Sequence, residues 1–181
     1  MNTYIALFRG INVGGNNILP MKELVSVLEG IGLTSVRTYI QSGNIVFQSK
    51  ATDTAQLATK ISSAIQKSHG FAPQVFLLEA SALRATIKAN PFPEGEAQGN
   101  TLHFNFLDDV PPTPDMAGIE KLRTASERHE LKDNVFYLHA PDGIGKSKLA
   151  VKLERLLGAP MTSRNWNTVI KLMEMADENA A

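Results

Sequence analysis

The spacing of apolar residues in the first ninety positions predicts alternating strands and helices. Short apolar, β-prone runs predict strands, and apolar residues three and four apart predict helices. Glycine, asparagine and serine clusters separate these runs, as expected of turns. The predicted elements are a strand at 3–8, a helix opening at Pro20, a strand at 36–40 that turns at 41–44 into a strand at 45–48, a helix capped by Asp53, and a strand at 74–78.

The second half of the sequence repeats this order of elements. Its apolar pattern predicts a strand, a helix, a hairpin that turns at Asp133-Asn134, and two further helices. We expect the last strand of the repeat to be replaced or shortened, and Thr162 or Ser163 to cap the final helix. The predicted elements are a strand at 101–107, a helix from Pro114, strands at 129–132 and 135–139, a helix at 146–157 and a final helix that contains Trp166.

The order strand-helix-strand-strand-helix-strand is that of the split βαβ, or ferredoxin-like, arrangement. We therefore predict an α+β protein built of two tandem ferredoxin-like halves with mostly antiparallel sheets, the second of which ends in a helix. The first half spans residues 1–90 and the second spans residues 101–181. Residues 91–100 are the predicted linker, because the stretch from Asn90 to Asn100 contains two prolines, two glycines and two glutamates.

The first strand is predicted to be buried on both of its faces. Tyr4, Ala6 and Phe8 alternate with Ile5 and Leu7, so both faces of the strand are apolar. We expect one face to pack against the two helices of the first half. The other face is expected to meet the second half.

Composition narrows the possible functions. The chain is 43% hydrophobic and carries 18 basic and 18 acidic residues, so no overall positive charge favours nucleic-acid binding. The absence of cysteine excludes disulfide scaffolds, zinc ribbons and thiol catalysis. The first residues lack a basic start followed by a long apolar run, and no stretch approaches the ~20 apolar residues of a membrane span. These features predict a cytoplasmic protein without a membrane partner.

Two polar loops are expected to meet at one edge of the first sheet. In the split βαβ topology, the loop at 9–17 and the hairpin turn at 41–44 lie at the same edge, and both are rich in glycine, asparagine or serine. Glycine-rich backbone exposes N–H groups to an anion, and Arg9 adds a guanidinium that suits phosphate. The alternative is that these residues only make tight turns and that Arg9 pairs with a carboxylate.

The segment before the final helix offers a second arginine. If the two halves dock edge to edge, Arg164 joins Arg9 in a charged cleft, where Trp166 would stack on a ring of the ligand. Trp166 is also in helical register with apolar residues, which favours a place in the core. The predicted ligand-binding residues are Arg9, Gly10, Asn12, Gly14, Gly15, Ser42, Gly43, Asn44, Arg164 and Asn165.

A second phosphate motif is weaker. Ala140 to Ser147 ends in Gly145-Lys146-Ser147, which satisfies a loosened phosphate-loop pattern with alanine in place of the first glycine. A nucleotide hydrolase, however, needs a parallel sheet and an acidic strand that holds magnesium. The sequence therefore favours an ordinary helix start with Ser147 near the cap.

Other chemistry has less support. His103 and His139 are expected on paired strands, but a metal site needs a third ligand, so we predict no metal and no cofactor. Ser42 lacks an evident histidine or acidic partner, which leaves nucleophilic catalysis unsupported. An RNA-binding sheet would use exposed aromatics such as Tyr4 and Phe47, but the required basic-glycine-aromatic motif is missing.

Four sequence blocks together resemble a known bacterial family. The blocks are Arg9-Gly10-Ile11-Asn12-Val13-Gly14-Gly15 followed by Met21-Lys22-Glu23-Leu24, Tyr39-Ile40-Gln41-Ser42-Gly43-Asn44, Lys148-Leu149, and Thr162-Ser163-Arg164-Asn165-Trp166-Asn167-Thr168-Val169. In combination they resemble the family known as domain of unknown function 1697, over essentially the whole chain. The resemblance implies a two-part α+β fold and no established activity, so no catalytic residue is carried over.

Three functions follow as hypotheses. The first is a protein, with or without catalytic activity, that binds an anionic or phosphorylated small molecule at the Arg9 edge. The second is a nucleic-acid-binding module that uses the same arginines together with aromatic residues of the sheet. The third is a protein interaction domain without catalysis. The sequence leaves the substrate, the reaction and the oligomeric state open.

Overall fold

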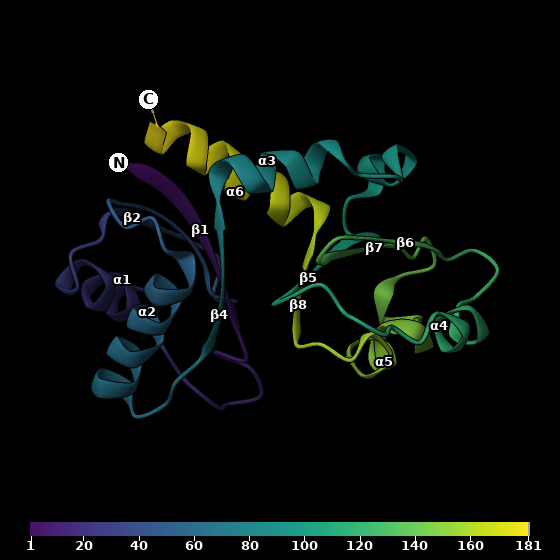
Figure 1. Cartoon of the computed structure of the whole chain (residues 1–181), viewed down its shortest axis with the longest axis horizontal. Coiled ribbons are helices and arrows are strands. Elements are labelled where there is room, and N and C mark those ends of the chain that lie inside the picture. The colour runs from purple at the N-terminus through teal and green to yellow at the C-terminus, as the bar shows by residue number, and fades with distance from the viewer. Residues whose placement is uncertain (181) are drawn as a thin grey trace. The chain divides into compact units, whose positions relative to one another are not determined.

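A computed structural model describes residues 1–180 of the chain and divides them into two compact units. The first unit comprises Met1–Ala85 together with the C-terminal residues from Lys171 on, and the second comprises Thr86–Ile170. Each unit contains one four-stranded antiparallel sheet with helices on it (Figure 1). The helices α3 (Ala80–Lys88) and α6 (Trp166–Ala180) each contribute residues to both units.

The first unit has the predicted ferredoxin-like order. Its sheet is arranged β2-β3-β1-β4, so β1 is central and pairs antiparallel with both β3 and β4. The two helices α1 and α2 lie on the same side of this sheet (Figure 1). The elements are β1 (Asn2–Arg9), α1 (Met21–Gly30), β2 (Thr34–Tyr39), β3 (Asn44–Ser49), α2 (Thr54–His69) and β4 (Gln74–Glu79).

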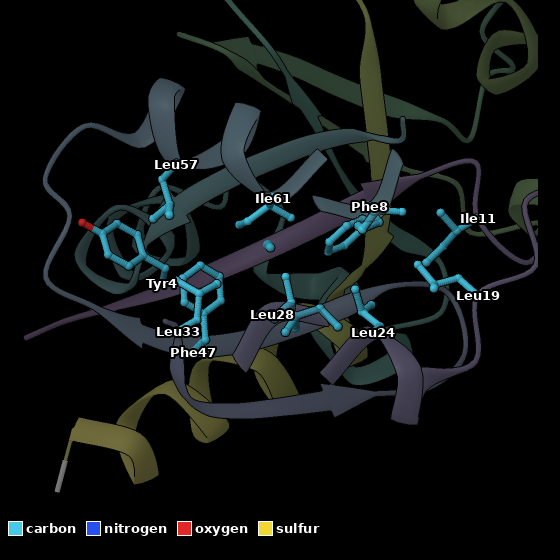
Figure 2. Close-up of a cluster of buried hydrophobic side chains, with 13 residues drawn as sticks. Tyr4, Phe8, Ile11, Leu19, Leu24, Leu28, Leu33, Phe47, Leu57 and Ile61 are labelled. Carbon is cyan, nitrogen blue, oxygen red and sulfur yellow. The ribbon is translucent and has the colours of Figure 1, made fainter. Parts of the chain in front are cut away.

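The core of the first unit forms between its sheet and these two helices. Tyr4 pairs with Phe47 across β1 and β3, and both rings are fully buried and stacked 5.7 Å apart. Figure 2 shows the cluster extending from Tyr4 at one end of β1 to Ile11 and Leu19 at the other. One face of β1 therefore packs against the two helices of this unit, as predicted. The aromatics Tyr4 and Phe47, considered above as exposed rings for RNA, are in the core.

The other face of this sheet is also buried, as predicted for β1. Ile5 and Leu7 are at most 1% exposed. The end of α6 lies on this side, because Glu178 pairs with Arg37 at 2.6 Å and the Gln48 side chain donates to the Asn179 carbonyl at 2.7 Å. The last residues of α6 thus pack on a sheet whose strands come from the first eighty residues of the chain.

The second unit repeats the topology of the first. Its sheet is arranged β6-β7-β5-β8, again with the first strand of the repeat in the centre. The helices α4 and α5 lie together on one side (Figure 1), where Ile119, Leu149 and Leu153 pack with apolar residues of the sheet. The elements are β5 (Leu102–Leu107), α4 (Met116–Leu122), β6 (Arg128–Lys132), β7 (Val135–His139), the short 3-10 helix η2 (Ile144–Lys146), α5 (Lys148–Leu157) and β8 (Met161–Asn165).

At the end of the second repeat the last strand is not replaced but is one residue shorter than β4, and the predicted helix cap is wrong. The last strand is present as β8, which pairs antiparallel with β5 from Met161 to Asn165. The cap of α6 is Asn165, whose Oδ1 accepts a hydrogen bond from the Thr168 amide at 3.0 Å, and not Thr162 or Ser163. The apolar pattern did not predict this strand, because it is polar at most positions and, at the edge of the sheet, has only one neighbouring strand.

The segment expected to link the halves is ordered against the second unit. Residues Pro93–Gln98 form the 3-10 helix η1, and the Phe92 ring stacks on His139. Gly95 lies so close to this histidine that an added Cβ would be 3.0 Å from its ring. Within residues 1–180, no helix is both long enough and apolar enough to cross a lipid bilayer.

Candidate functional site

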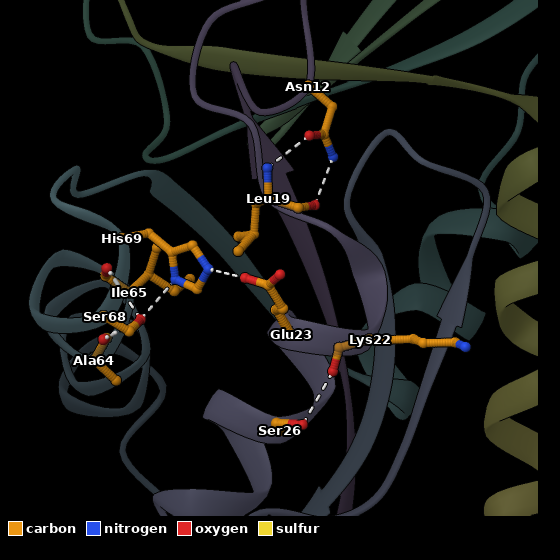
Figure 3. A network of polar contacts seen from close by, with 9 residues as sticks. All are labelled: Asn12, Leu19, Lys22, Glu23, Ser26, Ala64, Ile65, Ser68 and His69. Atoms are coloured by element: carbon orange, nitrogen blue, oxygen red, sulfur yellow. Dashed lines mark hydrogen bonds and ion pairs between the residues drawn. The ribbon is translucent and has the colours of Figure 1, made fainter.

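The two loops predicted to share an edge are in contact. The Asn12 side-chain amide donates one hydrogen bond to the Leu19 carbonyl and another to the Gln41 carbonyl, each at 2.9 Å. The Leu19 amide donates back to Asn12 Oδ1 at 2.7 Å (Figure 3). One asparagine therefore closes the loop between β1 and α1 and fastens it to the β2–β3 turn.

Gly43 makes this contact possible. Its carbonyl accepts a hydrogen bond from the Phe8 amide at 2.8 Å. Its φ of 77° lies in the left-handed region, and an added Cβ would be 2.7 Å from both Phe8 Cβ and Ile11 Cδ1. Only glycine fits this position without a shift of the neighbouring backbone, because the turn packs directly on β1 and the loop.

The predicted residues of the turn shape it from within. Asn44 is fully buried, and its Nδ2 donates to the Tyr39 carbonyl at 3.1 Å and to Ser42 Oγ at 2.9 Å. These bonds satisfy both N–H groups of the Asn44 amide. Asn44 therefore acts as a support for the turn, while Ser42 is exposed at its surface.

The tip of the first loop is a small ribbon that projects into solvent. The Asn16 amide donates to the Val13 carbonyl at 3.0 Å, and Asn17 Nδ2 donates to the Gly10 carbonyl at 3.0 Å. Gly14 and Gly15, between Val13 and Asn16, both have positive φ and are exposed. The loop is thus fixed by its own side chains while Gly10, Gly14 and Gly15 stay accessible.

Left-handed backbone is concentrated at this edge. Five non-glycine residues among the described residues have positive φ, and three of them, Asn12, Asn17 and Ile40, belong to these two loops. Asparagine tolerates this conformation, but a β-branched isoleucine rarely adopts it. Ile40 is also 51% exposed, so burial of its side chain offsets the strain only in part.

Arg9 lies in the first unit, whereas Arg164 and Asn165 lie in the second. Arg9 is half-buried at the end of β1, opposite Gln74 of β4. Arg164 is on β8 in the second unit, where its Nη1 donates to Thr162 Oγ1 and to the Ser163 carbonyl, both at 2.8 Å. Burial lowers the pKa of Arg164 to about 10, so this guanidinium remains charged at neutral pH. Asn165 is engaged as the cap of α6.

Trp166 packs against the second sheet. It is half-buried, and its ring meets the Phe104 ring edge-on at 5.8 Å between centroids. This contact supports the packing interpretation of Trp166 over stacking on a ligand.

The Gly145-Lys146-Ser147 segment does not form a phosphate loop. The amides of Gly143, Lys146 and Ser147 donate to the carbonyls of Ala140, Gly143 and Ile144. Ser147 Oγ accepts from the Ala150 amide at 3.0 Å and so caps α5. Because these amides are paired and the sheet is antiparallel, the ordinary helix start is the better description.

The paired histidines point away from each other. His103 is opposite Leu138, and His139 is opposite Leu102, so the two side chains lie on opposite faces of the sheet. The two histidines are thus on paired strands, as expected, but their side chains do not adjoin each other. Burial lowers the pKa of His103, and its Nε2 lies 3.1 Å from the Asn100 carbonyl. Across residues 1–180, no three histidine, aspartate or glutamate side chains are grouped to hold a metal.

Sequence reasoning missed a serine-histidine-glutamate cluster between α1 and α2. Ser68 Oγ lies 2.7 Å from His69 Nδ1, and His69 Nε2 lies 2.7 Å from Glu23 Oε2 (Figure 3). The Ser68 hydroxyl also donates to the Ala64 carbonyl at 3.0 Å. Because that bond commits the hydroxyl proton to the helix, the cluster acts as a brace between the helices and offers no activated nucleophile.

Sequence reasoning also missed a pocket at the opposite edge of the first sheet. Its volume is about 920 Å³, and none of the predicted ligand-binding residues lines it. The lining comes from the α1–β2 connection, the β3–α2 connection and the first turns of α2. No motif marks these segments, so the only sequence signal was the presence of Lys50 and Lys60 on either side of Asp53, the predicted helix cap.

Comparisons with known proteins agree with the fold and give no activity. The structure of the conserved bacterial protein SP0830 from Streptococcus pneumoniae is similar with a TM-score of 0.75 and 28% identity, over 97% of this chain and 98% of that one. No curated protein matches the chain. A family model described as "Protein of unknown function (DUF1697)" matches residues 1–137, which include the blocks at Arg9 and Tyr39. The chain therefore belongs to the DUF1697 family of proteins of unknown function.

Proposed function

We propose that this protein binds a small anionic ligand, such as a phosphorylated metabolite, at the edge formed by residues 9–17 and 40–44. The observation that carries the proposal is the bridge from Asn12 to both Leu19 and Gln41, which holds the two loops in one conformation. Prior ordering of a binding loop lowers the entropy lost when a ligand binds. A loop that is rigid, exposed and rich in left-handed backbone is typical of ligand clamps.

The predicted residues divide into two roles in this proposal. Asn12, Gly43 and Asn44 hold the loops in place through the contacts described above. The ligand would meet the exposed backbone of Gly10, Gly14 and Gly15, the Ser42 hydroxyl and the Arg9 guanidinium. Backbone N–H groups and a guanidinium are the donors that recognise phosphate oxygens best.

Arg164, on β8 of the second unit, is proposed as an anion-binding residue of that unit in its own right. It is charged at neutral pH although its side chain is half-buried. Its guanidinium already donates to Thr162 Oγ1 and to the Ser163 carbonyl. A phosphate that reached it would add a charge-assisted hydrogen bond to these. Asn165 would assist through the position of the β8–α6 junction that it caps.

The test is calorimetric titration with ribose 5-phosphate, AMP and pyrophosphate. We expect at least one of these to bind, and Arg9→Ala to weaken that binding tenfold or more. Arg155→Ala, which removes an exposed arginine from α5 of the second unit, is the matched control and should leave binding unchanged. Binding that survives Arg9→Ala intact would reject the proposed site.

A protein interaction is the second candidate, because apolar side chains are exposed at the same edge. Val13, Ile18 and Ile40 are 64%, 65% and 51% exposed, and they lie on the two loops that Asn12 joins. Sedimentation equilibrium of the wild type and of Ile18→Ser would show whether this edge mediates self-association.

Nucleic-acid binding has less support, because Tyr4 and Phe47, the aromatic residues considered for stacking on bases, are buried. Titration with a single-stranded dodecamer of thymidine is expected to show no salt-dependent binding.

A further inference from the structure

We infer that the pocket of about 920 Å³ in the first unit is a second ligand site, which takes an anion joined to an apolar group. The pocket lies where β1 begins, whereas the loops of the proposed anion edge follow its end. Seven residue steps along a strand separate two such points by about 23 Å. The pocket is therefore independent of the site proposed above.

The apolar part of the ligand has a defined place. Leu33, from the α1–β2 connection, and Leu57, from α2, both line the pocket and belong to the hydrophobic core. Figure 2 shows them at the Tyr4 end of that core. Each is only 4% exposed, so the pocket reaches down to the core. Its volume is within the range of about 300–1,000 Å³ that is usual for small-molecule sites.

The charge in the pocket favours an anion. Lys50 and Lys60 both line it, and no ion pair among residues 1–180 involves either of them. Lys60 Nζ donates to the Ile31 carbonyl at 2.8 Å, which fixes the ammonium group at the pocket wall. The single carboxylate of the lining, Asp53, accepts from the Gln56 amide at 2.9 Å and caps α2. The attraction for an anion therefore comes from the two lysines.

The second unit provides a comparison of opposite charge. Its pocket of about 310 Å³ occupies the equivalent place in the repeat, between the α4–β6 connection and the β7–α5 connection. Lys146 lines this pocket together with two carboxylates, those of Glu127 and Asp142. The fold thus places a cavity at the same edge of both repeats, but only the cavity of the first repeat has an excess of positive charge. Lys146 is consequently the matched control for the lysines of the first unit.

The experiment is isothermal titration of the full chain with hexyl phosphate and with hexanoate. Inorganic phosphate and hexanol test the charged and the apolar parts of the probe separately. We expect saturable binding of hexyl phosphate or hexanoate at one site, at least tenfold tighter than binding of inorganic phosphate or hexanol. Comparison of the two anionic probes identifies the headgroup. The double variant Lys50→Gln/Lys60→Gln should weaken the binding at least tenfold, and Lys146→Gln should change it less than twofold.

Further variants distinguish the effects of the two sites from each other and from a loss of folding. Lys50→Glu reverses an exposed charge without touching the bond from Lys60 to Ile31, so it tests the pocket even if the double variant unfolds. Arg9→Ala should leave hexyl phosphate binding unchanged. Absence of saturable binding, or binding that Lys50→Glu does not weaken, overturns the inference. Binding weakened by Arg9→Ala and not by the lysine variants overturns it too, while supporting the site at the loops.

Discussion

Gly43 lies so close to Ile11 that an added Cβ would be 2.7 Å from Ile11 Cδ1. The two residues belong to segments some thirty positions apart in the sequence, and their contact seals the end of the first core. The hydrophobic cluster includes Ile11, so a displaced turn would loosen that core as well.

We therefore expect Gly43→Ala to lower the free energy of unfolding by about 3 kcal/mol, from the combined cost of overpacking and left-handed backbone. Urea denaturation measures the loss. Gly10→Ala is the control, because Gly10 has a φ of 71° but no atom near an added Cβ. Its loss should be about 1 kcal/mol, the cost of the backbone conformation alone. Equal losses in the two variants would show that the close packing of Gly43 contributes nothing.

Asn12 is expected to stabilise both loops. Asn12→Ala removes three hydrogen bonds, to the Leu19 carbonyl, the Gln41 carbonyl and the Leu19 amide. At ~0.5–1.5 kcal/mol for each bond, the unfolding free energy should fall by about 2–3 kcal/mol. Hydrogen exchange at the Leu19 amide should also become faster. Asn16→Ala, at an exposed position of the same loop, should cost less than about 0.5 kcal/mol.

Replacement of Ile40 is expected to stabilise the protein. Ile40 has a φ of 52° and its side chain is half-exposed, so asparagine relieves the backbone strain at little cost in packing. Ile40→Asn should raise the unfolding free energy by about 1 kcal/mol. Ile18→Asn, at a somewhat more exposed position without positive φ, should bring no such gain. A loss of stability in Ile40→Asn would mean that the isoleucine side chain makes a contact that outweighs the strain.

His103 should make the protein less stable in mild acid. Burial is the larger effect on its ring and lowers the pKa of His103 below its usual value of 6.5. Below pH 6.5 the unfolded chain takes up this proton more readily than the folded one, so stability is full above pH 6.5 and falls as the pH drops toward the folded pKa. Proton NMR titration of the His103 ring should give a midpoint below 6.5. A midpoint at or above 6.5 would contradict the expected effect of burial.

The order of elements was predictable because each strand and helix of the core carries its own apolar period. The pairs Tyr4 with Phe47 and Phe136 with Asn105 follow from that order and the antiparallel register. The strand β8 was not predictable in the same way, since a polar edge strand has no apolar period. The contact between the loops could be predicted from the topology, but the role of Asn44 as a support of the turn could not. Its side chain is buried and serves the turn, which composition does not reveal.

The pocket at Lys50 and Lys60 illustrates a further limit of sequence reasoning. Its walls are chain connections without a common motif, and they meet only because of the way in which the helices cover the sheet. The histidines show the same limit on a smaller scale. His103 and His139 are on paired strands, but a register offset by one residue places them on opposite faces.

The contacts of Glu178 and Asn179 with β2 and β3 bear on how the chain folds during synthesis. The ribosome makes β1 to β4 first and residues 171–180 after the entire second unit, yet both segments belong to the same compact unit. The face of the early sheet that carries Ile5 and Leu7 therefore stays without this helix until the residues from Lys171 on have been made. Premature termination before Lys171 should release an aggregation-prone intermediate that depends on chaperones, even where the second unit has folded.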